Sequence, residues 1–455
     1  MDSSAESADG KGLRHFRYIA AGVALLLLLI ASVVAYGGGG SDDRSTSSPN
    51  RSVPPVRVAN ARAFIDSIGV NTHLHYADTA YAHYPMVRKR LRELGVKHIR
   101  DVLVANIPYQ PRRLEDLARL GIKANLIAHK PAMGYGSAFL KEQIAVLRGR
   151  ARAATESVEG PNEYDNKGDP NWVAALRDYQ RHLYRAVRSD PELDALPVLG
   201  PSLVPPSSHT SLADISAHLD RGNIHSYPGG QPPHLASFGR TLDETLEDAR
   251  INSGRAPVMA TESGYHNATA GNNEHPPASE RAAGIYIPRL FLEYFRRGVE
   301  RTYLYELIDE NPDPDGADPE QHFGLLRNDF SPKPAYVALK NLIALLSDRP
   351  DKRMTGSLRH RLEGETEGIE QLLLKGSDGS FYLALWQSAS VFDIERREDL
   401  RPPARTVTVR LEQPVALAER YRPGKSASPL ARYANAGAIR LSVPADVIVV
   451  RLAPR

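Results

Sequence analysis

The sequence predicts an α/β protein in which a (β/α)8 TIM barrel is followed by a C-terminal antiparallel β-sandwich, with an N-terminal transmembrane helix. Three observations support this prediction. A long uncharged apolar run lies near the N-terminus, amphipathic helical stretches alternate with short β-branched runs over residues 62–345, and this alternation stops near residue 350. A chain of 455 residues is long enough for one barrel and a smaller second domain.

The apolar run extends from Tyr18 to Tyr36 and contains no charged residue. At a rise of about 1.5 Å per residue, a helix of this length spans the hydrocarbon core of a bilayer. Basic side chains precede it, at Lys11, Arg14 and Arg17. Because positive flanks stay in the cytoplasm, residues 1–17 are predicted to be cytoplasmic, residues 18–36 to form a single-pass anchor in the cell membrane, and the remainder to be extracytoplasmic. The alternative is a cleaved signal peptide and a secreted protein.

Composition limits the compartment and the partners. The chain has no cysteine, which excludes disulfides, a thiol nucleophile and thiolate metal sites and suits an oxidising compartment. The 57 Lys and Arg residues nearly balance the 54 Asp and Glu residues, so no nucleic acid partner is expected. Residues 37–58 are rich in Gly, Ser and Pro, which predicts a flexible linker after the anchor.

Residues 59–347 are predicted to form the barrel domain. Its repeating unit is a helical stretch that ends in Leu-Gly and is followed by a strand, as in RKRLRELG before VKHIRDVLV and RRLEDLARLG before IKANLIA. Glycine favours the left-handed position that follows the last turn of a helix. With an opening strand at 66–76, eight strands are expected. Later helices are expected at 139–152, 172–188, 212–219, 242–251 and 279–297, and later strands in SVEGPNE, LPVLGPSLV, GNIHSY, APVMATES and VERTYLYEL.

Residues 348–455 are predicted to form the β-sandwich. Apolar and polar residues alternate in two strands around a Gly-containing turn in EQLLLKGSDGSFYLALWQ. The same period recurs in TVTVRLEQPVALAERY and IRLSVPADVIVVRLA, with no helical stretch between them.

Chemically distinctive side chains gather where the predicted strands end. In such a barrel, functional residues lie at the C-terminal ends of the strands, where the βα loops converge. The motif EGPNEYD at 159–165 places Asn162 and Glu163 at the end of strand 4, although alone it also reads as a simple turn. The other strand ends carry Asn71, His73 and His75; Arg100 and Asp101; His129 and Lys130; His225 and Tyr227; Thr261 and Glu262; and Tyr305, Glu306 and Asp309.

These residues resemble those of the clan A glycoside hydrolases, retaining β-glycosidases built on a barrel of this kind. In that clan the acid/base is a Glu preceded by Asn at the end of strand 4, and the nucleophile is a Glu at the end of strand 7. GPNEYD and VMATESGYH match this pattern with Asn162, Glu163 and Glu262. An Arg at strand 2 and a His and a Tyr at strand 6 are also usual, and the matching residues are Arg100, His225 and Tyr227. FGLLRNDFSPKPAYVALKNLIAL resembles the stretch after strand 8, and a trailing sandwich brings the similarity nearest to family 39.

The resemblance implies a retaining hydrolase that acts on a polysaccharide or oligosaccharide. With the predicted anchor, this substrate is expected outside the cytoplasm or at the cell surface, and cell-envelope polysaccharide machinery is an expected partner. No metal or other cofactor is expected. Glu163 would be the acid/base and Glu262 the nucleophile, with carboxyl groups about 5 to 5.5 Å apart. Asn162 would bind the sugar 2-hydroxyl. Arg100 and Tyr227 would hold Glu262 ionised while Glu163 titrates higher. Further substrate-binding residues are expected at His75, His129, His225 and Tyr305.

The sequence departs from the clan's pattern at two places. Pro161 and Tyr164 stand where an aromatic residue and a proline are common, and Tyr303 and Tyr305 occupy strand 8 where a Trp often forms the sugar platform. These departures leave the catalytic pair intact and the identity of the sugar open.

Three other interpretations remain. His73 and His75 form an H-x-H pair like that of metal-dependent amidohydrolase barrels, although PVLGPS supplies no further ligand at strand 5. A non-catalytic carbohydrate-binding barrel would keep an aromatic cleft but would not need both Glu163 and Glu262. The acidic loop DENPDPDGADPE at 309–320 could bind calcium or be solvated.

Overall fold

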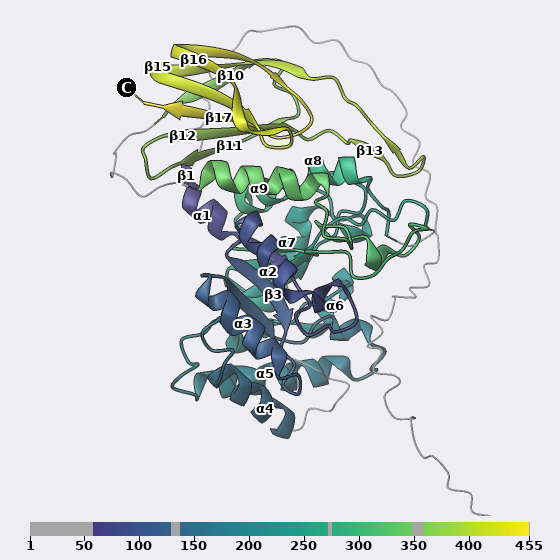
Figure 1. Cartoon of the computed structure of the whole chain (residues 1–455). Coiled ribbons are helices and arrows are strands. Elements are labelled where there is room, and N and C mark those ends of the chain that lie inside the picture. The colour runs from purple at the N-terminus through teal and green to yellow at the C-terminus, as the bar shows by residue number, and fades with distance from the viewer. Residues whose placement is uncertain (1–57, 129–136, 272–274, 348–357, 455) are drawn as a thin grey trace, which may run out of the picture. The chain divides into compact units, whose positions relative to one another are not determined.

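The computed structural model describes residues 58–128, 137–271, 275–347 and 358–454 (Figure 1). The predicted cytoplasmic segment, the predicted anchor at 18–36, all but the last residue of the linker, and His129 lie outside these ranges. Within them, no helix combines the length and the apolar character that crossing a bilayer requires.

Eight parallel strands form the first sheet, in the order β6-β5-β4-β3-β2-β9-β8-β7. The two end strands, β6 and β7, meet at a parallel bridge between Leu199 and Arg221, so the sheet is nearly closed into a barrel. This arrangement confirms the predicted eight-stranded parallel barrel. Its strands are β2 (Ile68–Asn71), β3 (His98–Val102), β4 (Lys123–Ile127), β5 (Thr155–Glu159), β6 (Val198–Leu199), β7 (Gly222–His225), β8 (Val258–Ser263) and β9 (Thr302–Leu304).

Amphipathic helices connect the barrel strands. In α5 (Trp172–Arg188), Leu176, Leu183 and Val187 recur at helical spacing and are buried. Gly95, with φ of 87°, ends α2 in the left-handed conformation that the Leu-Gly pattern predicts. The other helices of this part are α1 (Ala61–Asp66), α2 (Tyr84–Leu94), α3 (Tyr109–Arg119), α4 (Ser137–Arg148), α6 (Pro206–Leu212), α7 (Leu242–Ser253), α8 (Glu280–Arg296) and α9 (Pro334–Leu346).

The predicted helix at 212–219 is wrong. The helix α6 starts earlier, at Pro206, and ends at Leu212. Proline is favoured in the first turn of a helix, where its missing N–H is not needed. Ala213 then adopts a positive φ of 56°, which stops the helix, and only a short 3-10 turn, Ser216–His218, follows.

Several barrel strands are shorter than predicted. The first ends at Asn71 and the last at Leu304. The polar residues that follow, among them His73 and Glu306, therefore lie in loops just beyond the strand ends, where side chains can point across the mouth of the barrel.

The C-terminal part is built on one seven-stranded, mostly antiparallel sheet, of which Figure 1 draws six strands in green to yellow and β1 in purple. It fits the predicted sandwich. One strand comes from before the barrel: β1 pairs in parallel with β11, which the sequence pattern did not indicate. The strands are β1 (Val58–Asn60), β10 (His360–Gly364), β11 (Ile369–Lys375), β12 (Phe381–Gln387), β15 (Arg405–Arg422), β16 (Ser426–Val443) and β17 (Ile448–Ala453), and a separate hairpin joins β13 (Phe392–Asp393) to β14 (Glu398–Asp399).

Arg289 of α8 joins the barrel to the C-terminal part. Its side chain is fully buried, with Nε donating to the carbonyl oxygen of Ala445 (2.7 Å) and Nη1 to that of Ala389 (2.8 Å). Nearby, Trp386 Nε1 donates to Glu293 Oε1 (3.0 Å). These contacts satisfy buried polar groups of both parts.

We expect Arg289→Met to lower the free energy of unfolding by about 2–4 kcal/mol, because two buried carbonyl groups lose their donors. Denaturant unfolding of the purified protein measures the change. Arg281→Met is the matched control: Arg281 lies on the same helix but its bond to the Leu400 carbonyl is exposed, so its loss should cost less than about 0.5 kcal/mol. Equal effects of the two substitutions would contradict the role given to Arg289.

Candidate active site

Arg100, on β3, is the centre of the polar network at the C-terminal end of the barrel. Only 2% of the residue is exposed. Its Nε and Nη2 donate to the two carboxylate oxygens of Glu159, at 2.8 and 2.6 Å, and Nη1 donates to Asn71 Oδ1 at 3.0 Å. Glu159 is fully buried and also accepts from Asn223 Nδ2. The bidentate pair fixes the guanidinium plane, so its remaining contacts have a defined direction.

The outer contacts of Arg100 reach two of the predicted site residues. Nη1 donates to Glu262 Oε1 and Nη2 to Asn162 Oδ1, both at 2.6 Å. Tyr227 Oη donates to the other carboxylate oxygen of Glu262 at 2.7 Å. Both oxygens of Glu262 therefore accept strong hydrogen bonds, one of them from a cation.

Local backbone irregularity positions both glutamates. The register between β7 and β8 shifts next to Glu262, as it does at β-bulges that redirect side chains. Glu163 has a positive φ of 49°, which is unusual for a residue with a Cβ atom. Its N–H donates to the carbonyl and hydroxyl oxygens of Ser202, at 3.2 and 3.1 Å, and these bonds hold the loop in that conformation.

His225 lies between the two glutamates. Its Nδ1 is 2.7 Å from Glu163 Oε1 and 3.5 Å from Glu262 Oε2. One carboxylate oxygen of each glutamate and a ring nitrogen of His225 all lie within 4.8 Å of one another. The other ring nitrogen, Nε2, is 3.1 Å from Thr261 Oγ1. The side chains at the ends of β5, β7 and β8 thus converge on one point.

Electrostatics within this group favours a proton on His225. Burial opposes the charged imidazolium, but the carboxylates of Glu262 and Glu163 outweigh it and raise the pKa of His225. Burial likewise opposes the carboxylate of Glu163, but the hydrogen bond and charge of His225 prevail and lower the pKa of Glu163. The expectation that Glu163 titrates high is therefore wrong for this arrangement, because the sequence did not show that His225 pairs with it.

Comparison with known proteins was made on this geometry. No protein-family model matches the chain, and no curated protein matches it in sequence. Solved structures do. The family 39 glycoside hydrolase of Bacteroides cellulosilyticus WH2 matches with a TM-score of 0.61 and 16% identity over 87% of this chain and 83% of that one. The chain has the fold of the family 39 glycoside hydrolases.

Two further structures share the family 39 fold. The family 39 enzyme of Xanthomonas axonopodis pv. citri has a TM-score of 0.57 and 16% identity, covering 88% of this chain and 96% of that one. A monomeric β-xylosidase of Caulobacter crescentus CB15 has a TM-score of 0.58 and 15% identity, covering 88% and 98%.

Tyr303, in β9, and Tyr305, just after it, take different positions on this fold. Tyr305 lies at the barrel mouth, with its ring 5.3 Å from that of Phe323 and its hydroxyl 3.3 Å from Glu320 Oε2. Tyr303 is fully buried in the barrel interior, so it cannot serve as a sugar platform. The ring of Phe323 also lies 5.7 Å from that of Tyr227. Phe323 was not predicted as a site residue, because it follows the acidic loop and not a strand.

His73 and His75 do not converge on a shared ligand position. His75 Nδ1 is 3.5 Å from Asp101 Oδ1, whereas His73 Nε2 faces Glu306 and Glu310. Among the described residues, no group with metal-ligand spacing contains both histidines. This arrangement removes the basis for the amidohydrolase interpretation, which requires the pair to act together.

The loop at 309–320 uses several of its carboxylates internally. Asp309 accepts from Lys333 Nζ at 2.8 Å, and Asp313 accepts from two backbone N–H groups of the loop, those of Ala317 and Asp318. Glu310 and Glu320 instead lie toward the barrel mouth, and the sequence analysis missed both as site residues. Burial, with the charges of nearby carboxylates, raises the pKa of Glu310 to about 8 and that of Glu320 to about 7.

The raised pKa of Glu320 gives a pH dependence of stability. Glu320 stays protonated in the folded protein up to about pH 7, whereas in the unfolded chain it ionises near pH 4.3. The folded state binds more protons in that window, so the free energy of unfolding should fall as pH rises through it. Glu320→Gln should reduce this fall, and denaturant midpoints at about pH 4 and about pH 8 test it. If the denaturant midpoints of the variant and the wild type differ by the same amount at both pH values, the prediction is wrong.

Proposed function

We propose that this chain is a retaining β-glycoside hydrolase that acts by double displacement, with Glu163 as the acid/base and Glu262 as the nucleophile. One observation carries the proposal: two carboxylates with different hydrogen-bond partners face each other across the mouth of a family 39 fold, with oxygens within 4.8 Å. Retaining enzymes hold their carboxyl groups about 5 to 5.5 Å apart, and inverting enzymes about 6.5 to 9.5 Å to leave room for a water. The close approach favours retention.

Glu262 is suited to attack the anomeric carbon. Arg100 and Tyr227 each donate to one of its oxygens, and the two hydrogen bonds fix the orientation of the carboxyl group that would attack. Arg100 is itself fixed by Glu159, so the carboxylate is oriented before substrate arrives. When the glycosyl ester forms, the charge on Glu262 is lost and the Arg100 contact helps that carboxylate to leave again.

The proton for the leaving group resides in the Glu163–His225 pair. The raised pKa of His225 and the lowered pKa of Glu163 favour its position on His225 in the arrangement described above. A bound sugar would displace water from the cleft, and desolvation favours a neutral pair over an ion pair. The proton would then move from Nδ1 to Glu163 Oε1 over their 2.7 Å hydrogen bond. Glu163 could protonate the glycosidic oxygen and, after departure of the leaving group, activate the water that hydrolyses the intermediate.

Asn162 is placed to recognise the sugar 2-hydroxyl. Its Oδ1 accepts from Arg100 Nη2, and its Nδ2 would donate to the sugar. A contact with the 2-hydroxyl strengthens as the oxocarbenium-like transition state forms. The amide thus couples sugar recognition to the same arginine that holds the nucleophile.

Polysaccharide or oligosaccharide is the substrate class that we propose, with action outside the cytoplasm. The support for this location is the apolar run at 18–36 with its basic flank. Membrane fractionation and protease treatment of intact cells test it: an anchored extracytoplasmic enzyme should sediment with membranes and be cleaved from outside. A soluble form that begins after residue 36 would favour the signal-peptide alternative.

Hydrolysis of a panel of cell-surface polysaccharides, followed by proton NMR of the first product, tests the activity and the mechanism. Double displacement predicts that the β-anomer appears first, before mutarotation. Initial formation of the α-anomer would contradict the roles given to Glu163 and Glu262. Binding of a polysaccharide without cleavage would favour the non-catalytic carbohydrate-binding barrel.

A further inference from the structure

We propose that His73, Glu306 and Glu310 bind a divalent transition metal ion of the zinc class, beside the catalytic pair and separate from it. The three residues come from the loops that follow the first and last barrel strands, β2 and β9. A metal there would join these two loops at the barrel mouth. The proposed hydrolysis does not use it, so the proposal goes beyond the proposed function.

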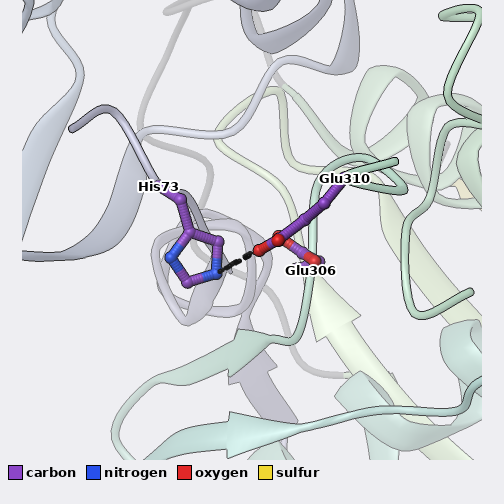
Figure 2. A group of neighbouring side chains, drawn as sticks. All are labelled: His73, Glu306 and Glu310. Atoms are coloured by element: carbon purple, nitrogen blue, oxygen red, sulfur yellow. Dashed lines mark ion pairs between the residues drawn. The ribbon is translucent and has the colours of Figure 1, made fainter. Parts of the chain in front are cut away.

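The spacing of the three side chains carries the first part of the argument. His73 Nε2 lies 3.4 Å from Glu306 Oε2 and 3.6 Å from Glu310 Oε1, and the three ligand atoms lie within 4.8 Å of one another. Figure 2 shows the imidazole pointing at both carboxyl groups. These separations are too long for good hydrogen bonds. Two ligands at about 2.1 Å from a zinc ion and at a tetrahedral angle lie about 3.4 Å apart, which matches.

The second, independent part of the argument is that atoms of Glu306 and His73 lack hydrogen-bond partners among the described residues. Glu306 is fully buried, and its Oε1 has no hydrogen-bond partner in the described parts of the chain. Neither ring nitrogen of His73 has one either. Buried polar atoms are nearly always paired, because an unpaired one loses its hydration without compensation. A metal ion held by His73 Nε2 and by both carboxylate oxygens of Glu306 would supply the missing partners of Nε2 and Oε1.

Charge points to a cation in particular. No Lys or Arg side chain of the described residues pairs with Glu306 or Glu310, whereas Glu262 has Arg100 and Asp309 has Lys333. Tyr81 Oη donates to Glu306 Oε2 at 2.7 Å, and the ring of His73 stacks on Tyr76 with centroids 4.7 Å apart. Such supporting contacts orient metal ligands. One imidazole and two carboxylates form a donor set that suits Zn²⁺ and leaves a coordination position open.

A substrate ammonium group is the competing cation, and the spacing disfavours it. Acceptors that surround an ammonium nitrogen at about 2.8 Å lie about 4.6 Å apart, wider than the separations seen here. The second group with ligand spacing, Glu163, His225 and Glu262, is a weaker metal site. Its carboxylates already accept from Arg100, Tyr227 and His225.

Calorimetric titration of the full-length protein, purified without a polyhistidine tag and stripped of metals with a chelator, tests the proposal with Zn²⁺ as the probe. We expect one equivalent to bind. Loss of a contact that only supports a metal ligand lowers metal affinity by about 10- to 100-fold. Glu310→Gln removes a ligand itself, so it should weaken zinc binding by at least that factor. Glu310 is partly exposed, so this variant should fold, which circular dichroism checks. His73→Phe, which keeps the stacking on Tyr76, should weaken binding similarly.

Two control variants separate the proposed site from its neighbours. His75→Phe removes the other histidine of the same loop, and Glu262→Gln removes a ligand from the other group; both should bind Zn²⁺ like the wild type. The proposal is overturned if the wild type binds no zinc, if Glu262→Gln weakens binding as much as Glu310→Gln, or if His75→Phe does so. It is also overturned if glucosamine, and not zinc, binds in a way that depends on Glu310.

Discussion

Glu262→Ala should lower turnover by about 10⁴-fold or more on any confirmed substrate, because no covalent glycosyl intermediate can form without the carboxylate. The protein should remain folded, since Arg100 keeps its two bonds to Glu159 after the Glu262 carboxyl is removed. Steady-state kinetics on wild type and variant measures the loss. The matched control is Glu320→Gln, which removes a nearby carboxyl that contacts Tyr305 and not the catalytic pair.

Azide distinguishes the roles of the two glutamates. With Glu262→Ala, azide should displace the leaving group directly and give the α-glycosyl azide. With Glu163→Ala, turnover should persist on substrates whose leaving group needs no protonation, and azide should attack the intermediate held on Glu262 to give the β-azide. NMR of the products decides between them. Wild-type turnover by both variants would exclude the pair and make Glu306 or Asp309 the next candidate.

Chelation gives an independent check on the separation of the two proposed sites. The cleavage chemistry depends on carboxylates and a histidine, so EDTA should leave hydrolysis within about twofold of the untreated rate. Activity abolished by EDTA and restored by zinc would instead mean that a metal takes part in the reaction.

Much of the fold could be predicted because the local sequence signals agree with the helices and strands that the chain forms. The Leu-Gly helix ends and the β-branched runs that follow them each carry their own signal, as Gly95 and its φ of 87° show. The prediction of a helix at 212–219 was wrong because Ala213 adopts a positive φ, which alanine as a residue type does not indicate. The pairing of β1 with β11 was missed because a three-residue strand has no detectable period and its partner lies far along the chain.

The site could be predicted only as a set of residue types at strand ends. The shared direction of the parallel strands places Arg100, Asn162 and Glu262 at the same end of the barrel, and their contacts cross its mouth. Which carboxylate pairs with His225 depends on distances of about an ångström, which a sequence does not contain. Glu159 lies on β5 four residues before Glu163, and its two bonds to Arg100 orient that side chain.

Arg100→Met should be the most destabilising substitution at the site. Glu159 is fully buried and would keep its charge without a cationic partner, and breaking a buried ion pair in this way costs about 3–5 kcal/mol. Turnover should also fall, by about 10²- to 10³-fold, because Glu262 and Asn162 lose an oriented donor. Denaturant unfolding and steady-state kinetics measure the two effects separately.

The double variant Arg100→Met/Glu159→Gln separates the effect of Arg100 on stability from its effect on turnover. Removing both charges leaves no uncompensated ion, so part of the lost stability should return, with a coupling free energy of about 1–3 kcal/mol between the two positions. Activity should not return, because the donor to Glu262 is still missing. If the double variant is as unstable as the sum of the single variants, Arg100 and Glu159 act independently. The preorganisation of Glu262 through Arg100 would then have no support.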